Sequence, residues 1–160
     1  MRHPYPWLDP AILAGQPTVG AMLDLCEENY RLLSRLVPGM RQRGPGERAR
    51  VSLGAELQVS ILEQTPYTTT LRLTYLFSDG EAASSRADPD ARLRLYHDAR
   101  QIEVLDLRQQ ALPVVAGYCA PSLQIKWRLN LFLSKWLGYC WRRGYCFDTA
   151  VFRLPDESCA

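Results

Sequence analysis

The chain lacks the patterns that mark several common classes of functional site. No phosphate-loop or dinucleotide-binding glycine motif occurs, and no G-x-S-x-G segment marks a serine nucleophile. The five cysteines are irregularly spaced, with no C-x-x-C pair, which argues against a zinc ribbon and a thioredoxin-type site. The two histidines, His3 and His97, lie far apart in the sequence, so we expect no metal site and no cofactor.

Long apolar runs are also missing. Lys126, Arg128 and Lys135 interrupt the most apolar segment, so no stretch reaches transmembrane length. The proline-rich start has no continuous apolar core of the kind found in a secretory signal. Together with the cysteine usage, these features predict a cytoplasmic protein in a reducing compartment, with no membrane contact.

Charge is unevenly distributed along the chain. The formal net charge of +2 is too small by itself to imply a nucleic-acid partner. Between Asp106 and Asp148, however, there is no acidic residue. The basic residues in that interval are Arg108, Lys126, Arg128, Lys135, Arg142 and Arg143. This part of the chain is therefore a candidate for binding an anion.

The length of 160 residues and a hydrophobic fraction of 47% predict one domain with its own core. Thr18 is the expected N-cap of a helix over residues 19–36, and a second helix is expected over about 123–143. Apolar residues alternate with polar ones around 57–61 and 71–77, which predicts strands. Between the elements we expect a basic loop at 38–50, a polar loop at 78–90 and a short strand within 145–154.

Residues 92–105 form a predicted β-hairpin that places Tyr96, His97 and Asp98 together at an exposed tip. Folding the chain about Asp98 and Ala99 brings apolar residues opposite apolar ones and a cation opposite an anion. The pairs are Leu95/Ile102, Leu93/Val104 and Arg94/Glu103. A slip of one residue would turn the apolar set to water, so the sequence itself defines the register.

These elements predict an α+β fold, a four-stranded antiparallel meander covered on one face by an N-terminal and a long C-terminal helix. Residues 1–17 are expected to form an N-terminal arm, residues 18–154 the single α+β domain, and residues 155–160 a frayed tail.

The predicted C-terminal helix has three distinct faces. One broad apolar face should cover the sheet: Ile125, Leu129, Phe132, Leu133, Trp136, Leu137 and Cys140. One flank carries a basic stripe with a period of seven residues: Arg128, Lys135 and Arg142. A third face is aromatic and apolar: Trp127, Leu131 and Trp141. A helix that is apolar on two faces is either buried twice or contacts a partner, here the N-terminal arm or a second protomer.

Three segments of the sequence resemble a known family. They are Leu25-Cys26-Glu27-Glu28-Asn29-Tyr30, Leu95-Tyr96-His97-Asp98-Ala99 and Asn130-x-Phe132-Leu133-x-x-Trp136-Leu137-x-Tyr139-Cys140. In this order and spacing the set resembles the bacterial YqiB-like family, a domain of unknown function (DUF1249). The resemblance implies a cytoplasmic bacterial protein and carries over no established activity, cofactor or catalytic residue.

Two groups of residues are candidates for chemistry. His97 could act as a general base if a turn brought Asp98 against it, or if Glu27 lay within reach; otherwise Asp98 builds the turn and His97 packs at the strand end. Asn29 lies inside the apolar stripe of the first helix, where its amide needs partners. It either holds a loop backbone or forms the polar floor of a ligand pocket.

The basic stripe, flanked by Trp127 and Trp141, suits nucleic acid or a phosphorylated ligand. Alternatively it is a solvated flank, or pairs with the acidic residues of the first helix, Asp24, Glu27 and Glu28. Our main hypothesis is a non-enzymatic binding or adaptor domain that uses this helix and the hairpin tip to contact a protein or an anionic ligand. The alternatives are an enzyme acting on a small anionic or nucleotide-like substrate, with His97 as general base, and a structural homodimer.

Overall fold

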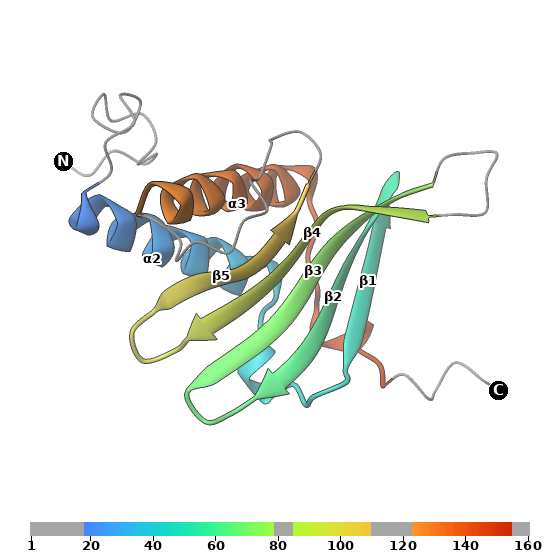
Figure 1. Cartoon of the computed structure of the whole chain (residues 1–160). Coiled ribbons are helices and arrows are strands. Elements are labelled where there is room, and N and C mark those ends of the chain that lie inside the picture. Colours follow the sequence, from blue (N-terminus) through green and yellow to red (C-terminus); the bar gives the residue numbers. More distant parts are fainter. Residues whose placement is uncertain (1–17, 79–84, 110–122, 155–160) are drawn as a thin grey trace, which may run out of the picture.

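A computed structural model describes residues 18–78, 85–109 and 123–154 (Figure 1). The predicted arm at 1–17 and tail at 155–160 lie outside the described residues. The helices are α2 (Val19–Leu36) and α3 (Leu123–Arg143), with short 3-10 helices η2 (Met40–Gln42) and η3 (Thr149–Val151). The strands are β1 (Arg48–Leu53), β2 (Ala55–Gln64), β3 (Thr68–Ser78), β4 (Ser85–Tyr96) and β5 (Gln101–Arg108).

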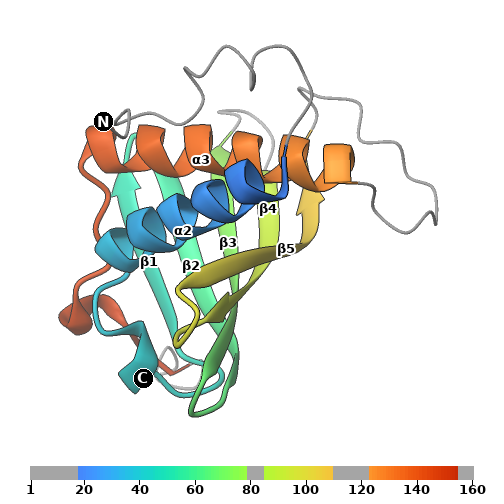
Figure 2. The ribbon, with the colours of Figure 1, turned by 90° about the vertical axis from the view of Figure 1, so that its left-hand side faces the viewer.

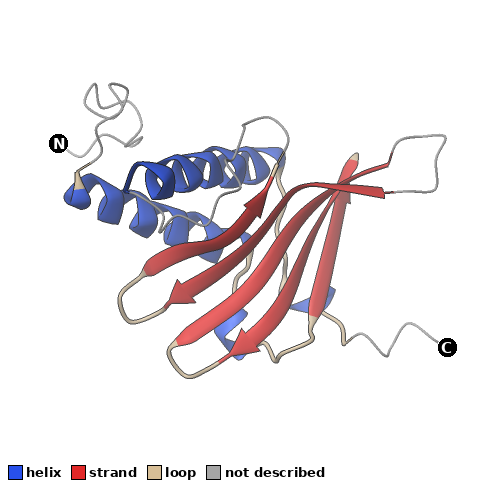
Figure 3. Cartoon of the chain, in the orientation of Figure 1, coloured by secondary structure: helices blue, strands red, loops and turns tan. Residues whose placement is uncertain are grey.

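The strands form one antiparallel sheet in the order β1-β2-β3-β4-β5, and α2 and α3 lie together on one of its faces (Figures 1 and 2). The predicted α+β class, with two helices over one face, is confirmed, and Figure 3 shows the separation of helices from strands. The other face of the sheet is not covered by either helix. A ligand could therefore contact either the outer surface of the helices or the open face of the sheet.

The predicted number of four strands is wrong, because the sheet has a fifth strand, β1. This strand occupies part of the segment that the sequence suggested was a basic loop. Its inward side chains are the small Ala49, which is buried, and Val51, which is half-buried, while Arg48 and Arg50 point outward. A strand with so few large apolar residues gives a weak alternating pattern, and the arginines dominate its composition.

Two other segments also differ from the prediction. The polar loop expected at 78–90 is shorter, since β4 already begins at Ser85 and pairs with the end of β3. Main-chain pairing does not require apolar side chains, so a polar stretch can extend a strand beyond the core. In place of a short strand after α3, the chain forms η3 and a single bridge in which Arg48 and Arg153 exchange main-chain hydrogen bonds of 2.8 Å.

Both helix predictions are confirmed in their bounds. Thr18 caps α2, because its hydroxyl oxygen accepts a hydrogen bond from the main-chain N–H of Ala21 at 3.1 Å. The hairpin register is also confirmed, with Leu95 opposite Ile102 and Arg94 opposite Glu103. The core therefore lies between the helices and the inward side of the sheet, where Leu71, Leu73, Leu93 and Leu95 alternate with outward polar residues.

Candidate functional site

His97 lies at the end of β4, but its side chain is turned into the protein and is only 6% exposed. The prediction of an exposed histidine at the hairpin tip is therefore wrong. The hydroxyl of Tyr30 on α2 lies 3.0 Å from Nδ1, and the hydroxyl of Thr69 on β3 lies 2.7 Å from Nε2. Burial lowers the pKa of His97, and the positive charge of Arg41 lowers it further. The imidazole therefore links α2 to the sheet as a neutral hydrogen-bonding group.

Neither candidate carboxylate lies against the imidazole. Asp98 accepts a hydrogen bond from the main-chain N–H of Ala99 at 2.9 Å, as expected of a residue that builds a turn. Glu27 contacts Arg31 on its own helix, with N and O atoms 3.9 Å apart. Since both ring nitrogens of His97 are taken by hydroxyl groups, the structure does not form the candidate acid–base pair.

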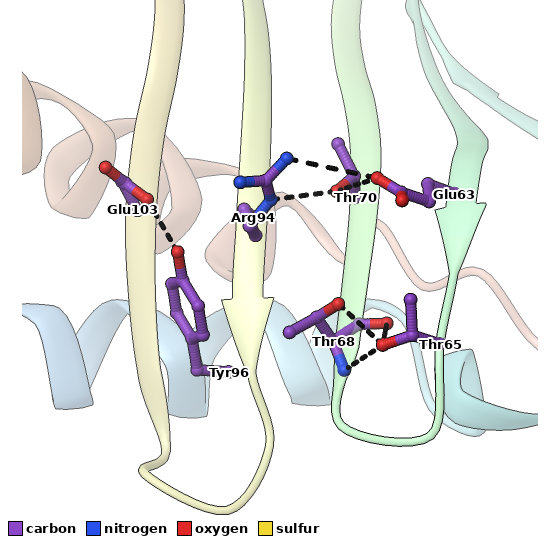
Figure 4. Close-up of polar contacts among 7 residues, drawn as sticks. All are labelled: Glu63, Thr65, Thr68, Thr70, Arg94, Tyr96 and Glu103. Atoms are coloured by element: carbon purple, nitrogen blue, oxygen red, sulfur yellow. Dashed lines mark hydrogen bonds and ion pairs between the residues drawn. The ribbon is translucent and has the colours of Figure 1, made fainter.

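Tyr96, the outward neighbour of His97, belongs to a polar row on the open face of the sheet (Figure 4). Its hydroxyl donates a hydrogen bond of 2.8 Å to the carboxylate of Glu103 on β5. Arg94 lies in the same region, 3.9 Å from the carboxylate of Glu63 and 3.3 Å from the hydroxyl of Thr70. Each of these charged groups therefore has a polar or charged partner on a neighbouring strand.

Asn29 is fully buried where α2 crosses α3. Its amide nitrogen donates to the main-chain carbonyl of Asn130 at 2.9 Å and approaches the Asn130 side-chain oxygen at 3.4 Å. The Asn130 amide in turn donates to the carbonyl of Lys126 at 3.0 Å, and the Cys26 thiol lies 3.7 Å from the Asn130 side-chain oxygen. Asn29 thus joins two helices, rather than holding a loop or forming the floor of a pocket.

Asn130 is a buried residue that we did not single out from the sequence as the partner of Asn29. A signal was present, because Asn130 is a polar residue within a predominantly apolar helix. The sequence alone does not show which groups such a polar residue contacts, however, because many partners are possible. The contact between Asn29 and Asn130 becomes evident only from the packing of α2 against α3.

The predicted basic stripe is exposed along α3, where Arg128, Lys135 and Arg142 all face solvent. Two of the three α2 carboxylates that could have neutralised it contact Arg31 instead, Glu28 at 2.9 Å and Glu27 at 3.9 Å. The third, Asp24, is exposed and forms no ion pair with any residue that the structure describes. Within the part of the chain that the structure describes, none of the three stripe residues forms an ion pair.

The two tryptophans predicted to flank the stripe differ in exposure. Trp127 is 3% exposed and belongs to the core, whereas Trp141 is 44% exposed. The guanidinium carbon of Arg35 lies over the Trp141 ring, 6.0 Å from the centroid of that ring. The predicted third face of α3, formed by Trp127, Leu131 and Trp141, is therefore buried at Trp127 and exposed at Trp141. The partner that packs on the first part of α3 is α2, through the contact of Asn29 with Asn130. Tyr139 is the exposed aromatic residue next to the stripe, at 42% exposure, four residues after Lys135.

A second charged cluster, which sequence reasoning missed, lies on the open face of the sheet. It surrounds a cavity of about 450 Å³ lined by Leu62, Arg72, Asp90, Arg92, Asp106 and Arg108. Finding it from the sequence would have required the pairing of four strands, because the six residues are spread over β2, β3, β4 and β5. Among residues 18–78, 85–109 and 123–154, no group of three histidine, cysteine, aspartate or glutamate side chains could hold a metal ion. Over the same residues, no helix is long and apolar enough to cross a membrane.

Residues 32–146 match the family described as "Protein of unknown function (DUF1249)". The chain is 35% identical over 134 residues to "Uncharacterized protein YqiB" of Escherichia coli strain K12, an alignment that covers 80% of this chain and 91% of the relative. The proteins of the same name from Escherichia coli O6:H1 and O157:H7 match with the same identity and coverage. No solved structure gives a significant match.

Proposed function

Because the chain belongs to this DUF1249 family, whose description states no activity, we propose from the structure that it is a non-enzymatic binding domain for an extended polyanion. The observation that carries the proposal is the stripe on α3: three exposed cations without an ion pair to any described residue. An acidic residue three or four positions away could pair with such a cation on a helix, but α3 contains no acidic residue.

The spacing of the stripe favours an extended ligand over a single phosphate group. Seven helical residues rise by about 10 Å, so the stripe from Arg128 to Arg142 spans about 20 Å. One phosphate cannot contact charges this far apart, whereas a nucleic-acid strand presents phosphates at repeated intervals. Tyr139 lies beside the stripe and offers a ring on which an unpaired base could stack. Nucleic acid is therefore the first ligand to test.

Two observations support a binding role over catalysis. Both nitrogens of the His97 imidazole already face hydroxyl partners, which leaves no free position to accept a substrate proton. Burial raises the pKa of Cys26 to about 11 and of Cys140 to about 12, so neither thiol forms the nucleophilic thiolate readily.

The test is a binding titration with fluorescently labelled single-stranded RNA, duplex DNA and a labelled nucleotide at low salt. We expect the wild-type protein to bind at least one of the nucleic acids, with an affinity that falls as salt rises because neutralised phosphates release counterions. The triple variant Arg128→Gln, Lys135→Gln, Arg142→Gln should lose this binding while keeping its melting temperature, since all three side chains are exposed.

A matched control separates the stripe from net charge. The variant Arg48→Gln, Arg86→Gln, Arg153→Gln removes the same number of exposed positive charges outside α3, and it should bind like the wild type. Equal loss in both variants would show that net charge, not the stripe, drives binding. No binding of any probe at low salt would contradict the polyanion proposal, and a protein partner would then be the hypothesis to test.

A further inference from the structure

The cavity on the open face of the sheet lies between two adjacent cross-strand rows. In one row, Arg72 on β3 stands directly opposite Arg92 on β4, which stands opposite Asp106 on β5. In the next row, Asp90 on β4 stands opposite Arg108 on β5. Like charges directly opposite each other on a sheet are destabilising. The pairing of Arg72 with Arg92 therefore calls for a compensating negative charge.

Asp90 compensates one of the two arginines. Arg72 Nε donates to Asp90 Oδ1 at 2.7 Å, and Arg72 Nη2 contacts the second carboxylate oxygen. The hydroxyl of Thr74 donates to Asp90 Oδ1 at 2.9 Å. The Asp90 side chain is only 10% exposed, and the hydrogen bond from Arg72 lowers its pKa despite this burial. Asp90 is therefore an ionised carboxylate that holds the Arg72 guanidinium in a fixed position.

The remaining charges of the cavity are not balanced in this way. Arg108 and Asp106 approach at 3.7 Å, but their side chains are 77% and 51% exposed, so their attraction is weak. Arg92 is exposed and has no ion pair with any residue that the structure describes. Three arginines and two aspartates line the cavity, which leaves an excess of one positive charge.

Arg94, on the same face of the sheet, has acidic residues on both sides that balance its charge. Arg94 lies between Glu63 on one side and Glu103, its cross-strand partner, on the other, and it also donates to Thr70 (Figure 4). Arg92 has only Asp106 as its cross-strand acidic partner, and no ion pair joins the two side chains. Arg92 is therefore less well balanced than Arg94, although both side chains lie on the same face of the sheet.

The size of the cavity, which is half open to solvent, is compatible with a small ligand. β-bulges interrupt the ladder between Ile61 and Glu63 and between Arg92 and Leu93, and bulges re-aim the side chains beside them. Leu62, the bulged residue of β2, is 45% exposed and forms an apolar wall of the cavity. The volume of about 450 Å³ falls within the range of about 300–1,000 Å³ that is usual for small-molecule pockets.

We propose that this cavity binds the oxyanion group of a metabolite-sized ligand, either a phosphate or a carboxylate. Arg92 and Arg108 would contact the anionic oxygens, because a guanidinium presents paired N–H donors to such groups. Arg72, fixed by Asp90, would supply a further donor, and Leu62 would contact the carbon part of the ligand. This site shares no residue with the stripe on α3 and lies on the opposite face of the sheet, so either proposal can fail alone.

The experiment follows arginine side-chain Nε–Hε signals by NMR in the full-length protein. Inorganic phosphate and succinate are added in separate titrations, with ionic strength held constant by potassium chloride. We expect saturable shifts of the Arg92 and Arg108 signals with at least one probe. Shifts with phosphate alone would identify a phosphoryl ligand, and shifts with succinate alone a carboxylate.

Two variants complete the test. Arg92→Gln, at an exposed position, should weaken binding at least tenfold while the amide spectrum remains that of the folded protein. Arg48→Gln is the matched control, because Arg48 is an exposed arginine in the same cross-strand row near the other edge of the sheet, and it should leave binding unchanged. The proposal would be overturned if neither probe bound at millimolar concentration, if potassium chloride alone produced the same shifts, or if Arg92→Gln bound as tightly as the wild type.

Discussion

Asn29 and Asn130 join the two helices of the domain through a hydrogen bond of 2.9 Å between the Asn29 side-chain amide and the Asn130 main-chain carbonyl. Both residues are buried, at 0% and 4% exposure. Such a contact in an otherwise apolar interface favours this relative placement of the helices, because it gives the buried Asn29 amide nitrogen an acceptor, although Asn29 Oδ1 has no partner among the described residues.

Replacement of Asn29 by leucine should destabilise the protein by about 1–3 kcal/mol, the usual effect of leaving buried polar groups unpaired. Urea denaturation measures this change. Asp24→Leu provides the control, since it makes a similar replacement at an exposed position of the same helix, where the effect should be within about 0.5 kcal/mol. Equal effects of the two variants would mean that the contact between the asparagines contributes nothing specific.

His97 should make stability depend on pH near neutrality. Its pKa in the folded protein is lower than the ordinary value of 6.5, so the unfolded chain binds the proton more readily. The contribution of the neutral imidazole is complete above pH 6.5 and is lost as the pH falls from there through the folded-state pKa. Urea denaturation between pH 7.5 and 5.5 should therefore show falling stability.

Two histidine variants test this assignment. His97→Gln should be less stable than the wild type at pH 7.5, but it should lose the decline in stability between pH 7.5 and 5.5. His3 is the only other histidine of the chain, so His3→Gln is the control. This variant should retain the decline, because it leaves His97 in place. If His3→Gln abolished the pH dependence instead, the titrating group would not be His97.

The sequence predicted those parts of the fold whose pattern is local. Thr18 is followed directly by the apolar stripe of its helix, and α2 is as predicted. The facing residues of the β4–β5 hairpin are likewise close to one another in the chain, and the hairpin register is as predicted. The strand β1 was missed because its inward residues include the small Ala49, and its pairing depends on β2. Local patterns do not report what a partner strand supplies.

The candidate site residues show the same division. The exposed flank of α3 follows from helical periodicity alone, so Arg128, Lys135 and Arg142 lie as predicted. The burial of His97 depends on Tyr30 and Thr69, which come from two other elements. The arginine cavity likewise exists only once β2 to β5 are aligned. Sites assembled from several strands require the register before they can be recognised.

The described cysteines should differ in reactivity toward iodoacetamide. Burial raises the pKa of Cys26 to about 11 and of Cys140 to about 12, whereas Cys146 is exposed. In the native protein at pH 8, Cys146 should be alkylated first, and the two buried thiols only after unfolding in urea. Mass spectrometry of tryptic peptides measures the order. Rapid alkylation of Cys140 in the native state would show that the end of α3 opens readily.

Loss of the Asp90 carboxylate should destabilise the sheet more than loss of any other acidic group around the cavity. Asp90 accepts hydrogen bonds from Arg72 and Thr74, and its side chain is nearly buried. Asp106 is half-exposed, and its single ion pair, with Arg108, is long at 3.7 Å. Asp90→Asn should reduce the free energy of unfolding by about 1.5–3 kcal/mol, the range for hydrogen bonds to charged groups. Asp106→Asn, the matched control, should change it by less than about 1 kcal/mol.

The two variants should also respond differently to acid. Because Arg72 lowers the pKa of Asp90 below its ordinary value of 3.8, the carboxylate contributes stability above that value. The contribution is lost as the pH falls through the folded-state pKa. The gap in stability between the wild type and Asp90→Asn should therefore narrow below pH 4, while Asp106→Asn should follow the wild type. A gap that stays constant down to pH 2.5 would show that Asp90 acts through its shape, not its charge.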